Sequence, residues 1–172
     1  MEGVAKVSLS IMSGDLAFTI IDTSGNTLRF DSFAYERPEE AARGDWHDAN
    51  WLRCNITLHA GIKHSVEASL LTREVRELSE ILQLVYASET ETERTFEPLE
   101  PYIELLKSRS ERGVDILARL DLHPACGPVI EFDYRCRPEE IARTVGDIER
   151  LRSAYPERNA QMKNDERRES VV

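Results

Sequence analysis

The segment from residue 113 to 136 constrains the fold of this chain more than any other part. Two runs in which apolar and polar residues alternate stand on either side of the loop HPACGP. The first run contains Val114, Ile116, Ala118, Leu120 and Leu122, and the second contains Ile130, Phe132, Tyr134 and Cys136. A period of two puts one side of a strand in the core and the other in water. The segment therefore predicts an antiparallel hairpin with one buried face.

A second hairpin is expected between residues 51 and 70. Its apolar positions are Leu52, Cys54, Ile56 and Leu58 on one strand and Ile62, His64, Val66, Ala68 and Leu70 on the other. These sets face each other if the loop has three residues, 59–61. The register then places Ile56 opposite His64, makes Cys54 and His64 diagonal neighbours, and gives Gly61 the left-handed conformation at the last loop position.

The chain before residue 36 predicts a three-stranded antiparallel meander. Its runs are separated by the turn signals MSGD and TSGN, and pairing Leu9 with Phe18 and Phe18 with Phe30 keeps the apolar side chains on one face. Residues 36–49 lose the alternation and predict a surface connection.

Helical spacing of apolar residues predicts two amphipathic helices. One begins at Thr72 and ends near Ser88, with Val75, Leu78, Ile81, Leu82, Val85 and Tyr86 on one stripe. The other opens at Pro138 and stops at Tyr155 and Pro156. We expect a single α+β domain over residues 1–155, a mainly antiparallel β-sheet of meander and hairpins packed with two amphipathic helices, and a polar, flexible tail over 156–172. The expected shared core comprises Leu52, Ile56, Val66, Leu70, Leu78, Leu82, Ile116, Leu120, Phe132, Val145 and Ile148.

The stretch ETETERTFEPLEPYIELLKS, residues 89–108, gathers glutamates around two prolines. Proline cannot donate to a β-ladder, so a loop is expected until regular pairing begins near Tyr102. The candidate binding residues are Glu91, Glu93, Glu97 and Glu100, read as an acidic patch for a cationic protein or as a solvated rim. The alternative binding loop contains Trp46 and His47.

Composition narrows the classes of partner. A net charge of −10 and a pI near 5.0 disfavour nucleic acid and anionic membranes and favour a basic protein, although acidity also serves solubility. The chain shows neither a leader pattern nor a long apolar stretch, and its three cysteines lack CxxC spacing, so a cytoplasmic protein with reduced thiols is expected.

No diagnostic catalytic or metal-binding motif is present. A nucleophile built from Cys54 and His64 lacks an orienting third group, and buried cysteine commonly acts as a small hydrophobe. The four histidines, His47, His59, His64 and His123, show no ligand spacing. We therefore expect no enzymatic activity, no cofactor and no metal.

Four segments resemble the WapI-like family of small bacterial immunity proteins: NWLRCNITLHAGIKHSVEASLLTREVREL, TFEPLEPYIELL, GVDILARLDL and VIEFDYRCRPEEIARTVGDIERL. The resemblance covers residues 50–155. It implies a protein that binds and neutralises a cognate toxin domain, with no catalytic residues to carry over. An accessory or small-ligand-binding domain, and a Cys54/His64 hydrolase, are the alternatives.

Overall fold

The computed structural model describes residues 16–37, 46–87, 93–100, 102–110, 113–123 and 127–158, except for the side chains of Trp46 and residues 107–110. Sheet A consists of β1 (Phe18–Ile21), β2 (Thr27–Tyr35), β3 (Trp51–His59) and β4 (Lys63–Leu71). Sheet B consists of β5 (Glu93–Phe96), β6 (Ile103–Ser110), β7 (Gly113–Asp121) and β8 (Val129–Cys136). The helices are α1 (Trp46–Asn50), α2 (Thr72–Ala87) and α3 (Pro138–Ala154). Both sheets are antiparallel, which confirms the α+β class.

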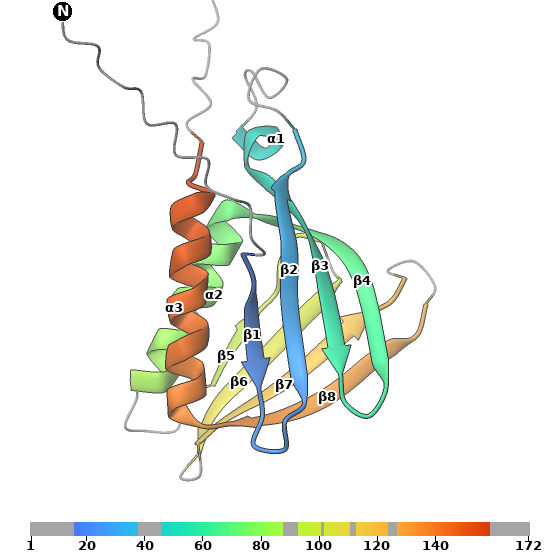
Figure 1. Ribbon diagram of the computed structural model, residues 1–172, viewed down its shortest axis with the longest axis vertical. Coiled ribbons are helices and arrows are strands. Elements are labelled where there is room, and N and C mark those ends of the chain that lie inside the picture. The colour runs from blue at the N-terminus through green and yellow to red at the C-terminus, as the bar shows by residue number, and fades with distance from the viewer. Residues whose placement is uncertain are drawn as a thin grey trace, which may run out of the picture.

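The two sheets lie one behind the other, with α2 and α3 together along one side (Figure 1). Helix α3 contacts β1 of sheet A, and α2 contacts β5 and β6 of sheet B. Each predicted unit of hairpin and helix is present, but the strands form two sheets and not the single sheet expected. Each sheet has one apolar face, and the two faces bury each other together with the helices. None of the described helices has the length and apolar composition needed to cross a membrane.

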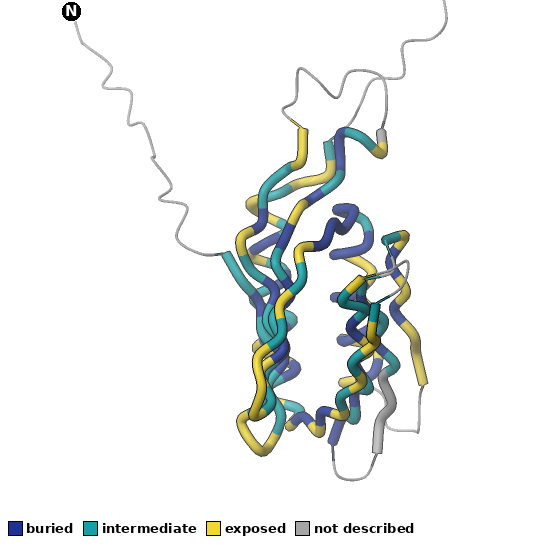
Figure 2. The backbone as a smooth tube through the Cα atoms, turned by 90° about the vertical axis from the view of Figure 1, so that its right-hand side faces the viewer, coloured by how far each residue is buried: buried dark blue, intermediate teal, exposed yellow. Residues whose placement is uncertain are grey.

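One hydrophobic core joins both sheets and both long helices. Buried and exposed residues alternate along the strands in Figure 2, as a two-sided sheet requires. The eleven residues expected from the sequence all belong to this core, eight of them fully buried. Val66, Phe132 and Val145 are only partly buried and pack at its margin.

The hairpin of residues 113–136 has the predicted register. Ile116 pairs with Tyr134, Ala118 with Phe132 and Leu120 with Ile130. Gly113 begins it at a φ of 141°, and a Cβ there would lie 2.5 Å from the carbonyl oxygen of Cys136. Only glycine fits this close approach. The pairing of Phe18 with Phe30 is also confirmed, whereas the proposed partner Leu9 lies outside the described residues.

The register predicted for the hairpin of residues 51–70 is wrong by two residues. Its loop does have three residues, but they are 60–62, and Ile56 pairs with Val66. Gly61 is left-handed at φ 75°, in the middle of the loop. Because a shift of two preserves which side chains share a face, alternation alone does not separate the two registers. Ile62, which was placed on the apolar face of the second strand, is 58% exposed in the loop.

Two further expectations need correction. Residues 93–96 were expected to lie in a loop but form β5, which pairs with β6 through Phe96 and Leu105. Tyr86, placed on the buried stripe of α2, is 43% exposed, whereas the other five stripe residues are buried. The helix starts agree with prediction, since α2 begins at Thr72 and α3 at Pro138.

The chain stays in contact with the body of the protein for a few residues after α3. Tyr155 donates its hydroxyl hydrogen bond to the carbonyl oxygen of Phe33. The side chain of Asn50 donates to the backbone oxygen of Arg158 at 3.0 Å and accepts from its N–H at 2.7 Å. The Arg158 guanidinium lies 3.4 Å from the ring centroid of Tyr35. Residues 155–158 therefore connect β2, α1 and α3, and the rest of the expected tail lies outside the described residues.

Candidate functional site

The outer face of sheet B, the face turned away from the core, carries an excess of negative charge. By strand register its ionisable residues are six acids, Glu93, Glu104, Asp115, Asp121, Glu131 and Asp133, and two bases, Arg119 and Arg135. Arg119 bridges Glu104 at 3.1 Å and Glu131 at 2.8 Å, and Arg135 pairs with Asp115 at 2.9 Å. Both bases are thus neutralised by their neighbours, and four negative charges remain in excess.

The outer face of sheet A has a different character. Its ionisable strand residues, apart from His59, are Arg29, Asp31, Arg53, Lys63 and Glu67, three bases against two acids. Arg29 pairs with Asp31 at 2.8 Å, and Arg53 lies 3.9 Å from Glu67. Of the two outer sheet faces, counted over their described strand residues, that of sheet B therefore carries the excess of negative charge. That face is the one suited to a basic macromolecule.

A pocket of about 360 Å³ opens at one end of the sheet B face. Its lining comes from three parts of the chain and consists of Glu97, Pro98, Ile103, Glu104, Arg119, Asp121 and Val129. Of its three apolar lining residues, Pro98 and Ile103 are buried and Val129 is 54% exposed. The lining contains three carboxylates and one guanidinium, that of Arg119. Arg119 is already paired with Glu104 and with Glu131. We call this cavity the sheet B pocket.

Of the four glutamates proposed as a patch, the three that the structure describes lie in different surroundings. Glu91 lies outside the described residues, Glu93 is exposed on β5, and Glu97 lines the sheet B pocket. Glu100 instead accepts a hydrogen bond from the backbone N–H of Ser69 on β4, at 3.2 Å. The side-chain hydroxyl of Ser69 donates a separate hydrogen bond to Glu36. Glu100 therefore has a structural partner that its spacing in the sequence did not reveal.

Glu74 has a related role at the start of α2. Its carboxylate accepts from the N–H of Leu71 at 2.7 Å and from the N–H of Leu99 at 2.8 Å. Burial, with the nearby charges of Glu36 and Glu74, raises the pKa of Glu100. Through these hydrogen bonds the two glutamates join the connection between β5 and β6 to the edge of sheet A.

The alternative binding loop is described only in part. Trp46 is the first residue of α1 and its side chain lies outside the described set, and His47 is exposed. Residues 38–45 lie outside the described residues. The proposal that this loop contributes to an interface therefore stays a prediction.

The arrangement of Cys54 and His64 does not match the predicted nucleophile. Cys54 pairs with Ala68 and His64 pairs with Leu58, so the two side chains are not diagonal neighbours. Burial raises the pKa of the Cys54 thiol to about 12, with a further contribution from Asp31. A thiol in this state is protonated at neutral pH, and a protonated thiol is a poor nucleophile. Cys54 contributes to the core of sheet A.

The described residues contain no group of three or more histidine, cysteine or acidic side chains arranged to hold a metal ion. Of the histidines, His59 ends β3 and His123 follows β7, both exposed.

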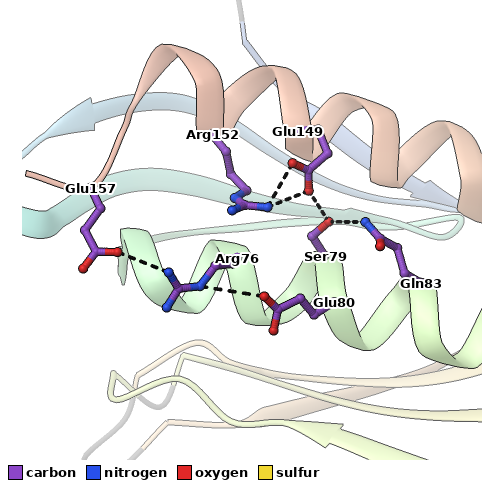
Figure 3. Close-up of polar contacts among 7 residues, drawn as sticks. All are labelled: Arg76, Ser79, Glu80, Gln83, Glu149, Arg152 and Glu157. Carbon is purple, nitrogen blue, oxygen red and sulfur yellow. Dashed lines mark hydrogen bonds and ion pairs between the residues drawn. The ribbon is translucent and has the colours of Figure 1, made fainter.

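A second pocket, of about 310 Å³, lies between the start of α2 and the end of α3. Figure 3 shows the polar contacts beside it, in which Ser79 of α2 donates to Glu149 of α3 at 2.6 Å. Arg152 binds the same carboxylate at 2.8 Å, and Arg76 binds Glu157 at 3.3 Å. Burial opposes ionisation of Glu149, but the hydrogen bonds from Ser79 and Arg152 lower its pKa. Arg76 also lies 3.8 Å from Glu80, so both bases among these contacts are already paired with acids.

Comparison with known proteins adds an independent observation. Residues 19–156 match the immunity protein WapI-like family. The chain belongs to this family. No curated protein and no solved structure matched the chain. The match begins at residue 19 and so includes β1 and β2, which the sequence resemblance over residues 50–155 had left out. In this WapI-like chain, all the residues that line the sheet B pocket lie within the matched range.

Several residues of the candidate site were missed at the level of sequence. Arg119, Asp121 and Val129 belong to the most regular hairpin, and their outward positions were read as the solvent side of a strand. A signal was present, because outward acids recur in β7 and β8 at Asp115, Asp121, Glu131 and Asp133. Only the pairing of β6 with β7 brings Glu104 beside Arg119 and makes the face continuous.

Proposed function

We propose that this WapI-like protein binds a cognate bacterial toxin domain and neutralises it by occupying its surface, without catalysis, in the cytoplasm of the cell that it protects. The family match over residues 19–156 carries this proposal. The toxin is proposed to be basic, because a protein of net charge −10 attracts a partner of opposite sign.

The charge distribution supports a surface on sheet B. Glu93 and Glu97 of the acidic patch adjoin its outer face, where acids outnumber bases. The described residues contain no ion-pair partner for Glu93, Glu97 or Asp133. Such carboxylates are already hydrated and exposed, so pairing them with a partner's lysines or arginines costs less desolvation than opening existing ion pairs.

The direct test first searches the genes beside the gene for this chain for one that encodes a toxin domain, and then uses that domain. The purified protein is mixed with that domain, and complex stoichiometry is measured by light scattering while toxin activity is assayed in parallel. We expect a 1:1 complex and loss of toxin activity at equimolar concentration. Inhibition at far below equimolar concentration would indicate turnover and contradict the non-enzymatic proposal, and absence of a complex would contradict the toxin as partner.

Salt dependence tests the charge component separately. Exposed charges are screened within about 10 Å at 0.1 M ionic strength, so association driven by charge slows as salt is added. Replacing Glu93, Glu97 and Asp133 with Gln, Gln and Asn removes three charges from exposed side chains. We expect slower association and a weaker salt dependence in stopped-flow measurements. An unchanged rate and salt slope would move the interface away from sheet B.

A further inference from the structure

The sheet B pocket combines apolar lining residues with carboxylates. Val129 is the exposed apolar residue of its lining, Pro98 and Ile103 are buried beneath it, and Glu97 and Asp121 contribute charge. The only hydrogen bond to the Asp121 side chain among the described residues comes from the backbone N–H of His123, at 2.9 Å. Neither acid is paired with a cation within the described part of the chain.

The basic group inside the pocket does not neutralise these acids. The Arg119 guanidinium donates to Glu104 and Glu131 at 3.1 and 2.8 Å, and these two carboxylates exceed its single charge. Both hydrogen bonds raise the pKa of Arg119, so its guanidinium stays charged. The negative potential of Glu97 and Asp121 is therefore available to an incoming cation.

The pocket also lies where a macromolecule can reach it. It opens beside the row formed by Glu104, Arg119 and Glu131, which crosses three strands of the outer face. Leu106 and Leu117 form the next row and are only partly buried. A protein placed on this face covers a continuous acidic surface with an apolar centre and meets the pocket at its margin.

We infer that the sheet B pocket receives an arginine or lysine side chain of the bound toxin, with its aliphatic stem along Val129 and its charged end beside Glu97 and Asp121. Such side chains bury their methylene groups along apolar walls while the head stays with polar partners. Arginine is also enriched among the residues that dominate interface energies. The inference rests on the proposed toxin-binding function and adds the location and the chemistry of the contact.

The second pocket fits this role poorly. Arg76 and Arg152 lie in its lining and are bound to Glu157 and Glu149, so a cation there would compete with existing partners. The outer face of sheet A carries a small excess of positive charge and would repel a basic toxin. Between the two pockets and the two outer sheet faces, charge complementarity therefore favours the sheet B pocket.

The test compares two changes in the pocket with one matched change on sheet A. The double variant Glu97→Gln, Asp121→Asn removes both charges, and asparagine keeps an oxygen that accepts from His123. Val129→Trp fills the pocket at an exposed position without changing charge. The control Asp31→Asn, Glu67→Gln removes the same number of charges from sheet A. Far-ultraviolet circular dichroism and thermal unfolding confirm that each variant is folded.

The measured quantity is the rate at which each variant dissociates from the toxin domain of the direct test, determined by surface plasmon resonance. Loss of an anchoring contact acts mainly on dissociation, so both pocket variants should dissociate on the order of tenfold to a hundredfold faster. The control should keep the dissociation rate of the parent. Pocket variants that dissociate no faster than the control would overturn the inference while leaving the toxin-binding function intact.

If the proposed toxin-binding function is wrong, the parent protein itself does not bind the toxin. This result differs from one in which the pocket variants alone are unaffected. Calorimetric titration of the parent with spermidine covers the small-ligand alternative. Saturable spermidine binding that Val129→Trp abolishes, with no toxin binding by the parent, would assign the pocket to a small cation and overturn the inference. Toxin binding by the parent with no saturable spermidine binding supports a protein side chain as the occupant.

Discussion

Glu100 accepts a hydrogen bond from the backbone N–H of Ser69, 31 residues earlier in the chain, at 3.2 Å. Ser69 lies on β4, an edge strand of sheet A, and Glu100 lies in the connection between β5 and β6 of sheet B. At the same edge, Glu74 accepts from the N–H of Leu71. Two carboxylates thus satisfy donors that a further strand would otherwise pair, which also covers part of an exposed edge.

Replacing Glu100 with Gln should change how stability depends on pH. A folded-state pKa above the unfolded value means that the folded protein binds the Glu100 proton more readily, so this residue favours folding more as pH falls toward the ordinary value of 4.5. At neutral pH its charge opposes folding. We therefore expect the variant to gain stability relative to the parent at pH 7, and the gain to shrink as pH approaches 4.5. Urea unfolding at several pH values measures this difference, and a difference independent of pH would contradict the raised pKa.

Replacing Glu74 with Ala should destabilise the fold. The side chain is only 4% exposed, and its loss leaves the N–H groups of Leu71 and Leu99 without their acceptor. An unsatisfied buried donor costs about 1–3 kcal/mol, so we expect a loss on the order of 2–4 kcal/mol in the free energy of unfolding. Glu77→Ala, at an exposed position of the same helix, is the matched control and should change stability by about 0.5 kcal/mol or less. Equal losses in the free energy of unfolding for the two variants would mean that Glu74 does not have this structural role.

Two phenylalanines that the alternation treats alike should differ in their contribution to stability. Phe30 is fully buried, with its ring centroid 4.4 Å from that of Phe18. Phe132 is partly exposed, although its ring lies 4.7 Å from that of Tyr134. We expect Phe30→Ala to cost about 3–5 kcal/mol, because it removes buried surface and leaves a cavity, and Phe132→Ala to cost clearly less. Chemical unfolding of both variants decides the comparison, and equal costs would mean that Phe132 is as fully packed as Phe30.

The thiols of Cys54 and Cys136 should be unreactive in the folded protein. Burial raises the pKa of each to about 12, which leaves almost no thiolate at neutral pH. In a Cys126→Ser background, a chromogenic thiol reagent should label no cysteine until denaturant is added, and then two. Rapid labelling of Cys54 in the folded protein, lost in a His64→Ala variant, would return the hydrolase alternative to consideration.

Local pattern determined much of this fold. The hairpin of residues 113–136, the pairing of Phe18 with Phe30 and the starts of both long helices follow from apolar periodicity, from Pro138 and from Thr72. These features depend on neighbours that are close in the chain, where side-chain spacing and turn chemistry restrict the backbone directly. The family resemblance was also present in the sequence, and the family match over residues 19–156 confirms it.

Tertiary structure decided between alternatives that apolar periodicity cannot distinguish. Alternation cannot distinguish registers that differ by two residues, so the position of the 60–62 loop was settled by packing. Residues 93–96 become a strand only because β6 offers them hydrogen bonds. Glu97 and Glu100, three residues apart, have different roles because one lines a pocket and the other meets β4. The contrast between the two outer faces arises in the same way, since it depends on which strands lie side by side, and that depends on long-range contacts.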